Sequence, residues 1–292
     1  KRYIVSTPET RDVCNDSDIM GTRFVGHIRT GIQRLLENIP DDVGFRGFTD
    51  KNTCVLHFLR GGLIFGLTDA LYRAYGFKRH FSSFMTSQRY RKGNEWFIKL
   101  DQYQKFSFPK NVNIFLGDVV ATGTTLENGI AKVYKNCLES GSNIRNFVLF
   151  TIGCKRAEEI MEKYDRYFRK SFKYENTYVF YLEGRFGLVD KKKECKICIP
   201  GTDLIRYPAL LAPEFEFSQY ESEPYLFERC VIYDVGSRAF EPPMHTEDAV
   251  GYWEKLSRSG MTLRQAYKER WPEEYGSLSE LKIKKKSTWP DI

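Results

Sequence analysis

The 292-residue chain lacks long hydrophobic runs, and no stretch approaches 18 apolar residues. We therefore expect no transmembrane helix, because a helix needs about 20 apolar residues to cross a bilayer. The start, KRYIVSTPETRD, has no apolar core of a signal peptide, so we expect no secretory signal. Internal repeats and low-complexity tracts are also missing. A hydrophobic content of 41% and an aromatic content of 15% exclude a disordered chain.

Patterns for metal binding and for nucleophilic catalysis are scarce. The seven cysteines are odd in number, and Cys54 and Cys154 lie inside apolar runs, which favours a reduced cytoplasmic protein over a disulfide scaffold. Cys195 and Cys198 form a lone CxxC without a second pair, so two thiols on a strand are favoured over zinc. The four histidines are scattered, and His57 in an apolar strand is favoured as a core side chain.

Charge is plentiful but uneven. The formal charge of +7 divides into +11 for residues 1–200 and −4 for residues 201–292. Residues 71–110 alone carry +7, and residues 214–248 carry −7. The basic segment indicates a phosphate-rich partner, with a solvated lysine surface as the alternative.

Short apolar runs alternate with helical patterns along the first 200 residues. This rhythm predicts an α/β domain with a mostly parallel sheet flanked by helices, in which ligands bind beyond the carboxyl ends of the strands. We expect strands at 54–59, 80–87, 112–117, 146–154, 177–182 and 196–199, helices at 18–38, 63–75, 125–140 and 155–170, and a mobile loop at 87–95.

The composition changes after residue 200, where acidic residues become more frequent and the periodic spacing of apolar residues weakens. We expect a domain at 1–200, made of a helical segment 1–50 and a core 51–200. Residues 201–292 then form a C-terminal extension of unknown role, with helices within 246–270 and a basic tail.

The sharpest motif is NIFLGDVVATGTTL at residues 113–126. An apolar strand leads to Asp118, and a loop of small residues then opens a helix. The segment 121–125 offers backbone N–H groups, three hydroxyls and a helix N-terminus, all suited to a phosphate monoester. Gly123 permits close approach or a positive φ, and Asp118 can accept hydrogen bonds from ribose hydroxyls. The motif predicts a sugar-phosphate cradle, with an ordinary threonine-capped turn as the alternative.

This run resembles the signature of the type I phosphoribosyltransferases, in which a T-G-x-T type loop holds the 5′-phosphate of phosphoribosyl pyrophosphate (PRPP). The resemblance is closest to the hypoxanthine–guanine type and covers residues 30–200. Five segments follow one another in the family's order: FLRGGLIFGLTDAL, TSQRYRKGN, the loop 118–125, CKR after the strand NFVLFTIG, and FGLVD.

The resemblance implies a role for each segment, with Asp118, Arg60 and Arg89 as the catalytic residues. The site residues that it implies are Arg60, Gly61 and Gly62 for the pyrophosphate; Ser87, Arg89, Tyr90 and Arg91 on a closing lid; Asp118 for the ribose; Ala121, Thr122, Gly123, Thr124 and Thr125 for the 5′-phosphate; Lys155 and Phe186 for the base; and Asp190 for Mg²⁺.

Two positions depart from the family's pattern. Gly117 stands where the family has the first acid of a pair, so one ribose-hydroxyl acceptor is missing. Ala121 stands where purine-type enzymes carry an Asp near the purine ring, whereas adenine- and uracil-type enzymes resemble this chain. For this reason we transfer no purine specificity.

Two function classes remain open. The first is an enzyme that uses PRPP and Mg²⁺ to transfer phosphoribose to a base-like nitrogen acceptor, with release of pyrophosphate. The second is a PRPP- or nucleotide-binding regulator or effector subunit, favoured by Gly117 and by the length beyond residue 200. We expect a homo-oligomer or a subunit of a complex, with no membrane partner. A nucleic-acid partner rests on charge and on aromatics such as Tyr90 and Tyr103, and ranks below these.

Overall fold

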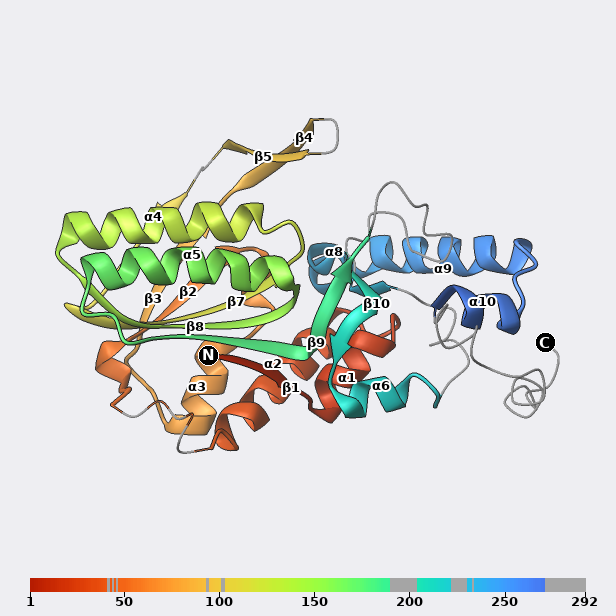
Figure 1. Cartoon of the computed structure of the whole chain (residues 1–292), viewed down its shortest axis with the longest axis horizontal. Helices are drawn as coiled ribbons and strands as arrows, with labels where there is room; N and C mark the ends of the chain where they lie inside the picture. Colours follow the sequence, from red (N-terminus) through yellow and green to blue (C-terminus); the bar gives the residue numbers. More distant parts are fainter. Residues whose placement is uncertain are drawn as a thin grey trace.

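The computed structural model describes residues 1–40, 43, 45, 47–92, 95–100, 103–189, 204–221, 230–232 and 234–270. Within these residues, nine strands form one central sheet (Figure 1). They are β1 (Arg2–Val5), β2 (Thr53–Leu59), β3 (Phe81–Thr86), β6 (Gln104–Lys105), β7 (Asn111–Val120), β8 (Asn143–Cys154), β9 (Asn176–Leu188), β10 (Leu204–Leu211) and β11 (Cys230–Ile232).

The sheet is mostly parallel, as the sequence predicts. Its order is β11-β10-β9-β8-β7-β2-β3-β6, with β1 paired to β9. Strands β1, β9, β8, β7, β2 and β3 pair in parallel, and β6, β10 and β11 pair antiparallel at the two ends. The expected strands at 54–59, 80–87, 112–117, 146–154 and 177–182 are all confirmed. The expected strand 196–199 and the CxxC within it lie outside the described residues.

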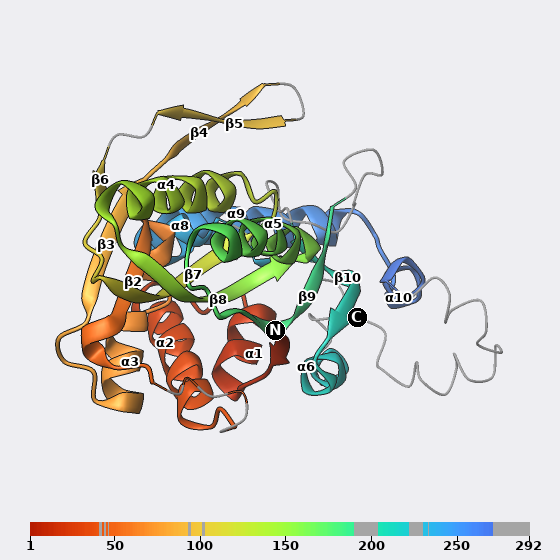
Figure 2. The same cartoon turned by 60° about the vertical axis from the view of Figure 1, so that its left-hand side comes forward.

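Helices cover both faces of the sheet (Figure 2). Helices α4 (Thr124–Ser140) and α5 (Lys155–Ser171) lie on one face, and α1 (Pro8–Asn15), α2 (Gly21–Glu37) and α3 (Leu67–Tyr75) lie on the other. Side chains alternate between faces along a strand, so Val55 of β2 packs towards α2 and α3 while Leu56 and Phe58 pack towards α4 and α5. Strands buried on both faces account for the continuous apolar runs of the sequence. In the described part of the chain, no helix is long and apolar enough to span a bilayer.

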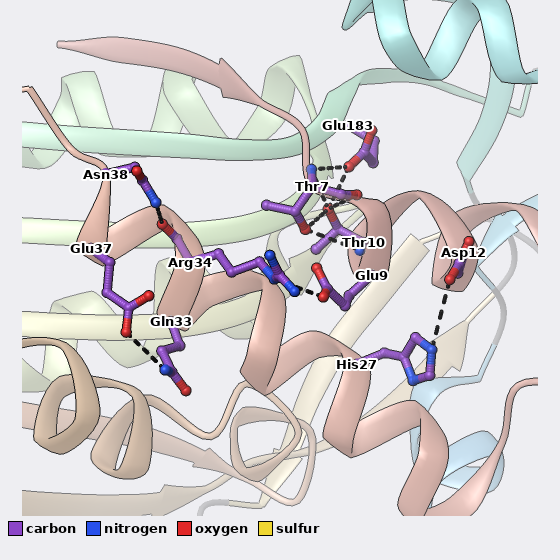
Figure 3. Close-up of polar contacts among 10 residues, drawn as sticks. All are labelled: Thr7, Glu9, Thr10, Asp12, His27, Gln33, Arg34, Glu37, Asn38 and Glu183. Carbon is purple, nitrogen blue, oxygen red and sulfur yellow. Dashed lines mark hydrogen bonds and ion pairs between the residues drawn. The ribbon is translucent and has the colours of Figure 1, made fainter.

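The helix α1 lies within the segment 1–50 that was expected to be helical, whereas β1 is a short strand that the sequence did not indicate. Helix α1 begins with a capping box, in which Thr7 and Thr10 bond to each other's backbone N–H groups. The buried carboxylate of Glu183 in β9 also accepts hydrogen bonds from Thr7 and Thr10 (Figure 3). This strand therefore ties the start of α1 to the sheet.

The helix expected to begin at Leu63 begins later. Gly61–Leu63 forms a short 3-10 helix, η2, and α3 begins at Leu67. Between them Gly66 has a φ of 55°, in the left-handed region where a helix cannot continue. The spacing of apolar residues over 63–75 gives no sign of this break, because Gly66 changes the backbone conformation and leaves that spacing helical.

The mobile loop expected at 87–95 is wrong as secondary structure, because the described residues of this segment are mostly strand. Strands β4 (Gln88–Lys92) and β5 (Glu95–Leu100) pair antiparallel as a separate two-stranded sheet. Figure 1 shows this hairpin standing out beyond α4. The polar composition of 87–95 suggested a loop, but strand pairing depends on the partner, and the run EWFIKL lies directly opposite.

The described part of the C-terminal extension continues the central sheet. Its elements are β10, α6 (Pro213–Ser218), β11, α8 (Val235–Phe240), α9 (Pro242–Arg258) and α10 (Leu263–Arg270). The buried guanidinium of Arg206 in β10 donates to Asn15 Oδ1 at 2.6 Å and to Gln219 Oε1 at 2.8 Å. The extension is thus fastened to the end of α1. The domain boundary at residue 200 stays a prediction.

Candidate functional site

The carboxyl ends of the parallel strands bring most of the expected site residues to one edge of the sheet. Leu59 of β2 pairs with Thr86 of β3, and Val120 of β7 pairs with Gly153 of β8. The residues that follow these strands are Arg60, Ser87, Ala121 and Lys155. Segments far apart in sequence therefore lie side by side, as parallel sheets require of loops that form a site.

The loop between β7 and α4 forms an open helix N-terminus. Gly123 is the N-cap of α4 with a φ of 75°, and no side chain caps the helix there. Its backbone N–H groups are therefore available to an anion, and the helix dipole adds to the attraction. The hydroxyls of Thr122 and Thr124 lie 3.2 Å apart beside it. This geometry favours the phosphate cradle over the threonine-capped turn. We call residues 121–125 the cradle.

Helix α5 supports the cradle from the side. A Cβ on Gly123 would lie 2.4 Å from Ile160 Cδ1 and 2.9 Å from Arg156 Cγ, so this position has room for glycine alone. Glu127, in the first turn of α4, pairs with Lys163 at 2.6 Å and with Arg156 at 3.0 Å. These two cations hold the pKa of Glu127 below its usual range. The first turn of α4 is thus flanked by positive charge.

Asp118 and Gly117 lie on β7 just before the cradle. Asp118 is half-buried, and its Oδ1 accepts a hydrogen bond from the Val119 N–H at 3.0 Å. A Cβ on Gly117 would lie 2.3 Å from Cγ of the buried Phe65. The missing acid therefore has a physical reason: an aromatic ring fills the space into which its side chain would project.

The turn Arg60-Gly61-Gly62 lies next to this part of β7. A Cβ on Gly62 would lie 3.4 Å from the Gly117 carbonyl oxygen and 3.4 Å from His57 Cα. A side chain at this position would therefore make ordinary van der Waals contact with β7. His57 is 6% exposed and stacks on Phe84, with ring centroids 4.8 Å apart. This agrees with its expected place in the core. We call residues 60–62 the pyrophosphate turn.

Arg60 is held by the C-terminal extension, which sequence reasoning missed. Its Nη2 donates to Glu241 Oε2 at 2.7 Å, and its guanidinium carbon lies 5.7 Å from the centre of the Phe240 ring. A Cβ on Gly236 would lie 3.2 Å from Arg60 Nε, so α8 also packs against this side chain. The hydrogen bond from Arg60 to Glu241 raises the pKa of Arg60. The one related sequence signal was the net charge of −7 on residues 214–248, which include Glu241.

The two residues expected to bind the base differ in environment. Lys155 is exposed at the first position of α5. Phe186 is 3% exposed, and its ring packs edge-to-face on Phe215 of α6 at 5.8 Å. Phe186 therefore belongs to the core in this conformation, and its stacking role stays a prediction.

The expected lid residues belong to the hairpin and its base. Ser87 Oγ accepts a hydrogen bond from Asn128 Nδ2 of α4 at 3.1 Å, and β5 contacts the same helix. Arg89, Tyr90 and Arg91 lie on β4, opposite β5. The residues expected to form a lid thus lie on a β-hairpin and at its base, which is attached to α4, and their closing role stays a prediction.

Two further features of the described part of the chain concern side chains that could hold a metal without a substrate, and the buried thiols. It contains no group of three or more His, Cys, Asp or Glu side chains that could hold a metal ion. Asp190, the expected Mg²⁺ ligand, lies outside the described residues. Burial raises the pKa of Cys54 to about 12 and also raises that of Cys154, as expected for unreactive buried thiols.

Comparison with known proteins gives one family match and several structural neighbours. A family model described as PRTase-CE matches residues 32–252. Hypoxanthine phosphoribosyltransferase from Staphylococcus aureus is 17% identical, with 67% of this chain and 91% of that chain covered at a TM-score of 0.32. Orotate phosphoribosyltransferase from Aeropyrum pernix is 18% identical, with 54% and 75% covered at 0.31. A point mutant of hypoxanthine phosphoribosyltransferase from Trypanosoma cruzi is 20% identical, with 66% and 95% covered at 0.29.

No curated protein matches the chain. The PRTase-CE model nevertheless spans most of the 292 residues, from the middle of α2 into α9. The chain therefore belongs to the PRTase-CE family.

Proposed function

We propose that this protein binds PRPP with Mg²⁺ and transfers the phosphoribosyl group to a nitrogen of a base-like acceptor. The C1′–O bond to pyrophosphate breaks, and a bond from C1′ to the acceptor nitrogen forms. Pyrophosphate leaves with the bonding electron pair, and the acceptor loses a proton.

One observation carries this proposal. An uncapped helix N-terminus with hydroxyls beside it, a carboxylate and an arginine–glycine turn all lie at the carboxyl ends of the neighbouring strands β7 and β2. The cradle suits the 5′-phosphate, Asp118 suits the ribose hydroxyls, and the pyrophosphate turn suits the leaving group. The cradle, Asp118 and the pyrophosphate turn thus correspond to the 5′-phosphate, the ribose and the pyrophosphate of PRPP.

Mg²⁺ fits this donor set as part of the substrate. The ion commonly binds through one or two carboxylates together with substrate phosphates and waters, not in an all-protein cage. Asp118 is a half-buried carboxylate next to the cradle, so it suits this role. When bound, Mg²⁺ would supply charge that stabilises the departing pyrophosphate.

The protein's own residues would act by position and charge. Thr122, Thr124 and Thr125, with the N–H groups of α4, would hold the 5′-phosphate and so align C1′ with the acceptor. Asp118 would bind the ribose and stabilise the positive charge that develops on the sugar. Arg60 would neutralise pyrophosphate as it leaves. Lys155, exposed at the same edge, is our candidate for the acceptor's polar contact.

The hairpin is our candidate for the closing element. Its base is attached to α4 through Ser87 and Asn128, and Arg89, Tyr90 and Arg91 lie on its first strand. Closure over PRPP would exclude water, which otherwise competes with the acceptor for C1′.

A second function remains a candidate: a regulator or effector subunit that binds PRPP or a nucleotide without turnover. The observation that favours it is Phe65, which fills the place of the acid missing at Gly117.

For either function we propose a homo-oligomer or a subunit of a larger complex. We also propose a reducing, cytoplasmic setting, supported by the five free buried cysteines of the described residues. A nucleic-acid partner rests only on the charge of residues 71–110.

One experiment separates the two functions. The protein is incubated with PRPP, Mg²⁺ and a panel of nitrogen bases, and pyrophosphate release is measured alongside PRPP binding. For an enzyme, Asp118→Asn should lower turnover about 100-fold or more, because a charge that stabilises the transition state is lost. Asp248→Asn, which removes an exposed carboxylate of α9, is the matched control.

The other outcomes are equally informative. PRPP binding without pyrophosphate release for every base would support the regulator. Absence of PRPP binding would rule out the enzyme and a regulator that binds PRPP. Equal turnover by wild type and Asp118→Asn would remove Asp118 from the mechanism.

A further inference from the structure

The corner between α8 and α9 presents a carboxylate to the pyrophosphate turn. Glu241 is the residue between the two helices, and its Oε2 accepts the 2.7 Å hydrogen bond from Arg60 Nη2. The side chain of Glu241 is 42% exposed and that of Arg60 is 51% exposed. A carboxylate thus occupies a donor of Arg60 that the pyrophosphate of PRPP would otherwise use.

The backbone of this corner is firmly docked, so the contact does not depend on a loosely placed segment. Arg238 of α8 is 1% exposed and donates from Nε to the Ile19 carbonyl oxygen at 2.8 Å. His245 of α9 is also 1% exposed, and its Nε2 lies 2.7 Å from the Ser17 carbonyl oxygen. These anchors lie on either side of Glu241 in sequence. The carboxylate can therefore leave Arg60 by a side-chain rotation, without undocking the helices.

Glu241 touches one half of the site and not the other. The pyrophosphate turn has its arginine paired with the extension. The cradle instead packs against α5, through Gly123, Arg156 and Ile160. A ligand that fills only the cradle leaves the Arg60–Glu241 pair intact. A ligand with a pyrophosphate shares the Arg60 guanidinium with Glu241 or displaces it, and in both cases lies beside a carboxylate, which repels it.

We propose that Glu241 is a specificity-determining residue that favours phosphoribosyl ligands without pyrophosphate, such as ribose 5-phosphate or a nucleoside 5′-monophosphate, over PRPP. The inference rests on the proposed function, because it requires the cradle to hold the 5′-phosphate. Glu241 thereby raises the PRPP concentration that the protein needs. It also lowers the affinity for the released pyrophosphate.

The test compares PRPP with its two parts, ribose 5-phosphate without the pyrophosphate and inorganic pyrophosphate without the sugar phosphate. Binding of PRPP, inorganic pyrophosphate and ribose 5-phosphate is measured by calorimetry with Mg²⁺ for wild type, Glu241→Gln and Glu254→Gln. Glutamine keeps the size of the side chain and removes its charge. Glu254 is an exposed α9 carboxylate paired with Arg258, so its substitution removes the same charge elsewhere on the helix. Thermal melting confirms that all three proteins are folded.

Glu241→Gln should bind PRPP and pyrophosphate about tenfold more tightly, since a like charge next to the ligand is removed. Its affinity for ribose 5-phosphate should stay within about twofold of wild type, and Glu254→Gln should behave as wild type. The gain for PRPP should shrink in high salt, because the pair is partly exposed to solvent.

Three results would overturn the inference. PRPP affinity that is unchanged or weaker in Glu241→Gln would mean that Glu241 does not compete, or that it positions Arg60 for the ligand. An equal gain for ribose 5-phosphate would mean that the carboxylate acts on the whole site. If none of the three proteins binds PRPP or ribose 5-phosphate, the proposed function fails and this inference fails with it.

Discussion

The cradle and the pyrophosphate turn lie side by side but differ in how the chain builds them. The cradle is a continuous stretch between β7 and α4, and its neighbours come from α5. The pyrophosphate turn is also continuous, but Arg60 is held by Glu241, 181 residues away. One half of the site is thus complete within the α/β core. The other depends on the extension, which suggests that ligand choice in this chain is set where the extension meets the core.

The largest expected effect comes from detaching the extension. Arg238→Met removes the hydrogen bonds that its guanidinium donates to the Asp16 and Ile19 carbonyl oxygens, while the Asp16 carbonyl keeps the bond from the Ile19 N–H at 3.4 Å. We expect the free energy of unfolding to fall by about 3 kcal/mol, measured by urea denaturation. Ribose 5-phosphate binding should persist below the unfolding transition, because the cradle packs on α5. Arg258→Met, at an 80% exposed position of α9, is the control. Loss of ribose 5-phosphate binding in the folded Arg238 variant would contradict the independence of the two halves.

The next effect is a loss of stability at Gly117, on β7 between the cradle and the pyrophosphate turn. Gly117→Asp restores the family's first acid but places its Cβ against Phe65. Overpacking of this kind should lower the free energy of unfolding by about 2 kcal/mol. In a Phe65→Ala background the same substitution should cost clearly less, because the ring that it meets is gone. Chemical denaturation of the four proteins of this cycle gives the coupling. A coupling near zero would show that Phe65 is not the reason for glycine here.

The smallest effect is a pH dependence at the joint between α1 and the extension. Glu183 is fully buried, and its carboxylate accepts a hydrogen bond from Ser6 Oγ at 2.7 Å. The backbone carbonyl of Glu183 accepts a hydrogen bond from the Ala212 N–H at 2.9 Å. Burial raises the pKa of Glu183 to about 7. A raised pKa favours the protonated folded state, so the stability that this group contributes is present below about pH 4.5 and is lost as the pH rises through 7.

Wild-type stability should therefore decrease by about 1 to 2 kcal/mol between about pH 5 and 7 relative to Glu183→Gln. Denaturation midpoints at several pH values measure this difference. Glu162→Gln, at an exposed position of α5, should keep the wild-type profile. A Glu183→Gln profile parallel to that of wild type would show that this carboxylate does not titrate in the range.

Much of the fold was predictable because local signals and tertiary packing agree. The continuous apolar runs of β7 and β8 indicate strands buried on both faces, and both strands are found. The ATGTT loop likewise indicates an open helix N-terminus, and α4 begins at Thr124. By contrast, the hairpin β4–β5 was missed, because the polarity of 87–92 gives no sign of the strand that pairs with it. The delayed start of α3 at Leu67 was missed because periodicity does not reveal the left-handed Gly66.

The order of amino acids alone accounts for the elements whose causes are local: the apolar core strands, the helix that the cradle opens, and the order of loops at the carboxyl edge. Hydrophobic periodicity and glycine placement act over a few residues, so a single reading of the chain contains them. Long-range packing is what puts Phe65 in the place of the missing acid and pairs Glu241 with Arg60. Both depend on segments that meet in space, and no local pattern records which carboxylate of an acidic stretch reaches a given arginine.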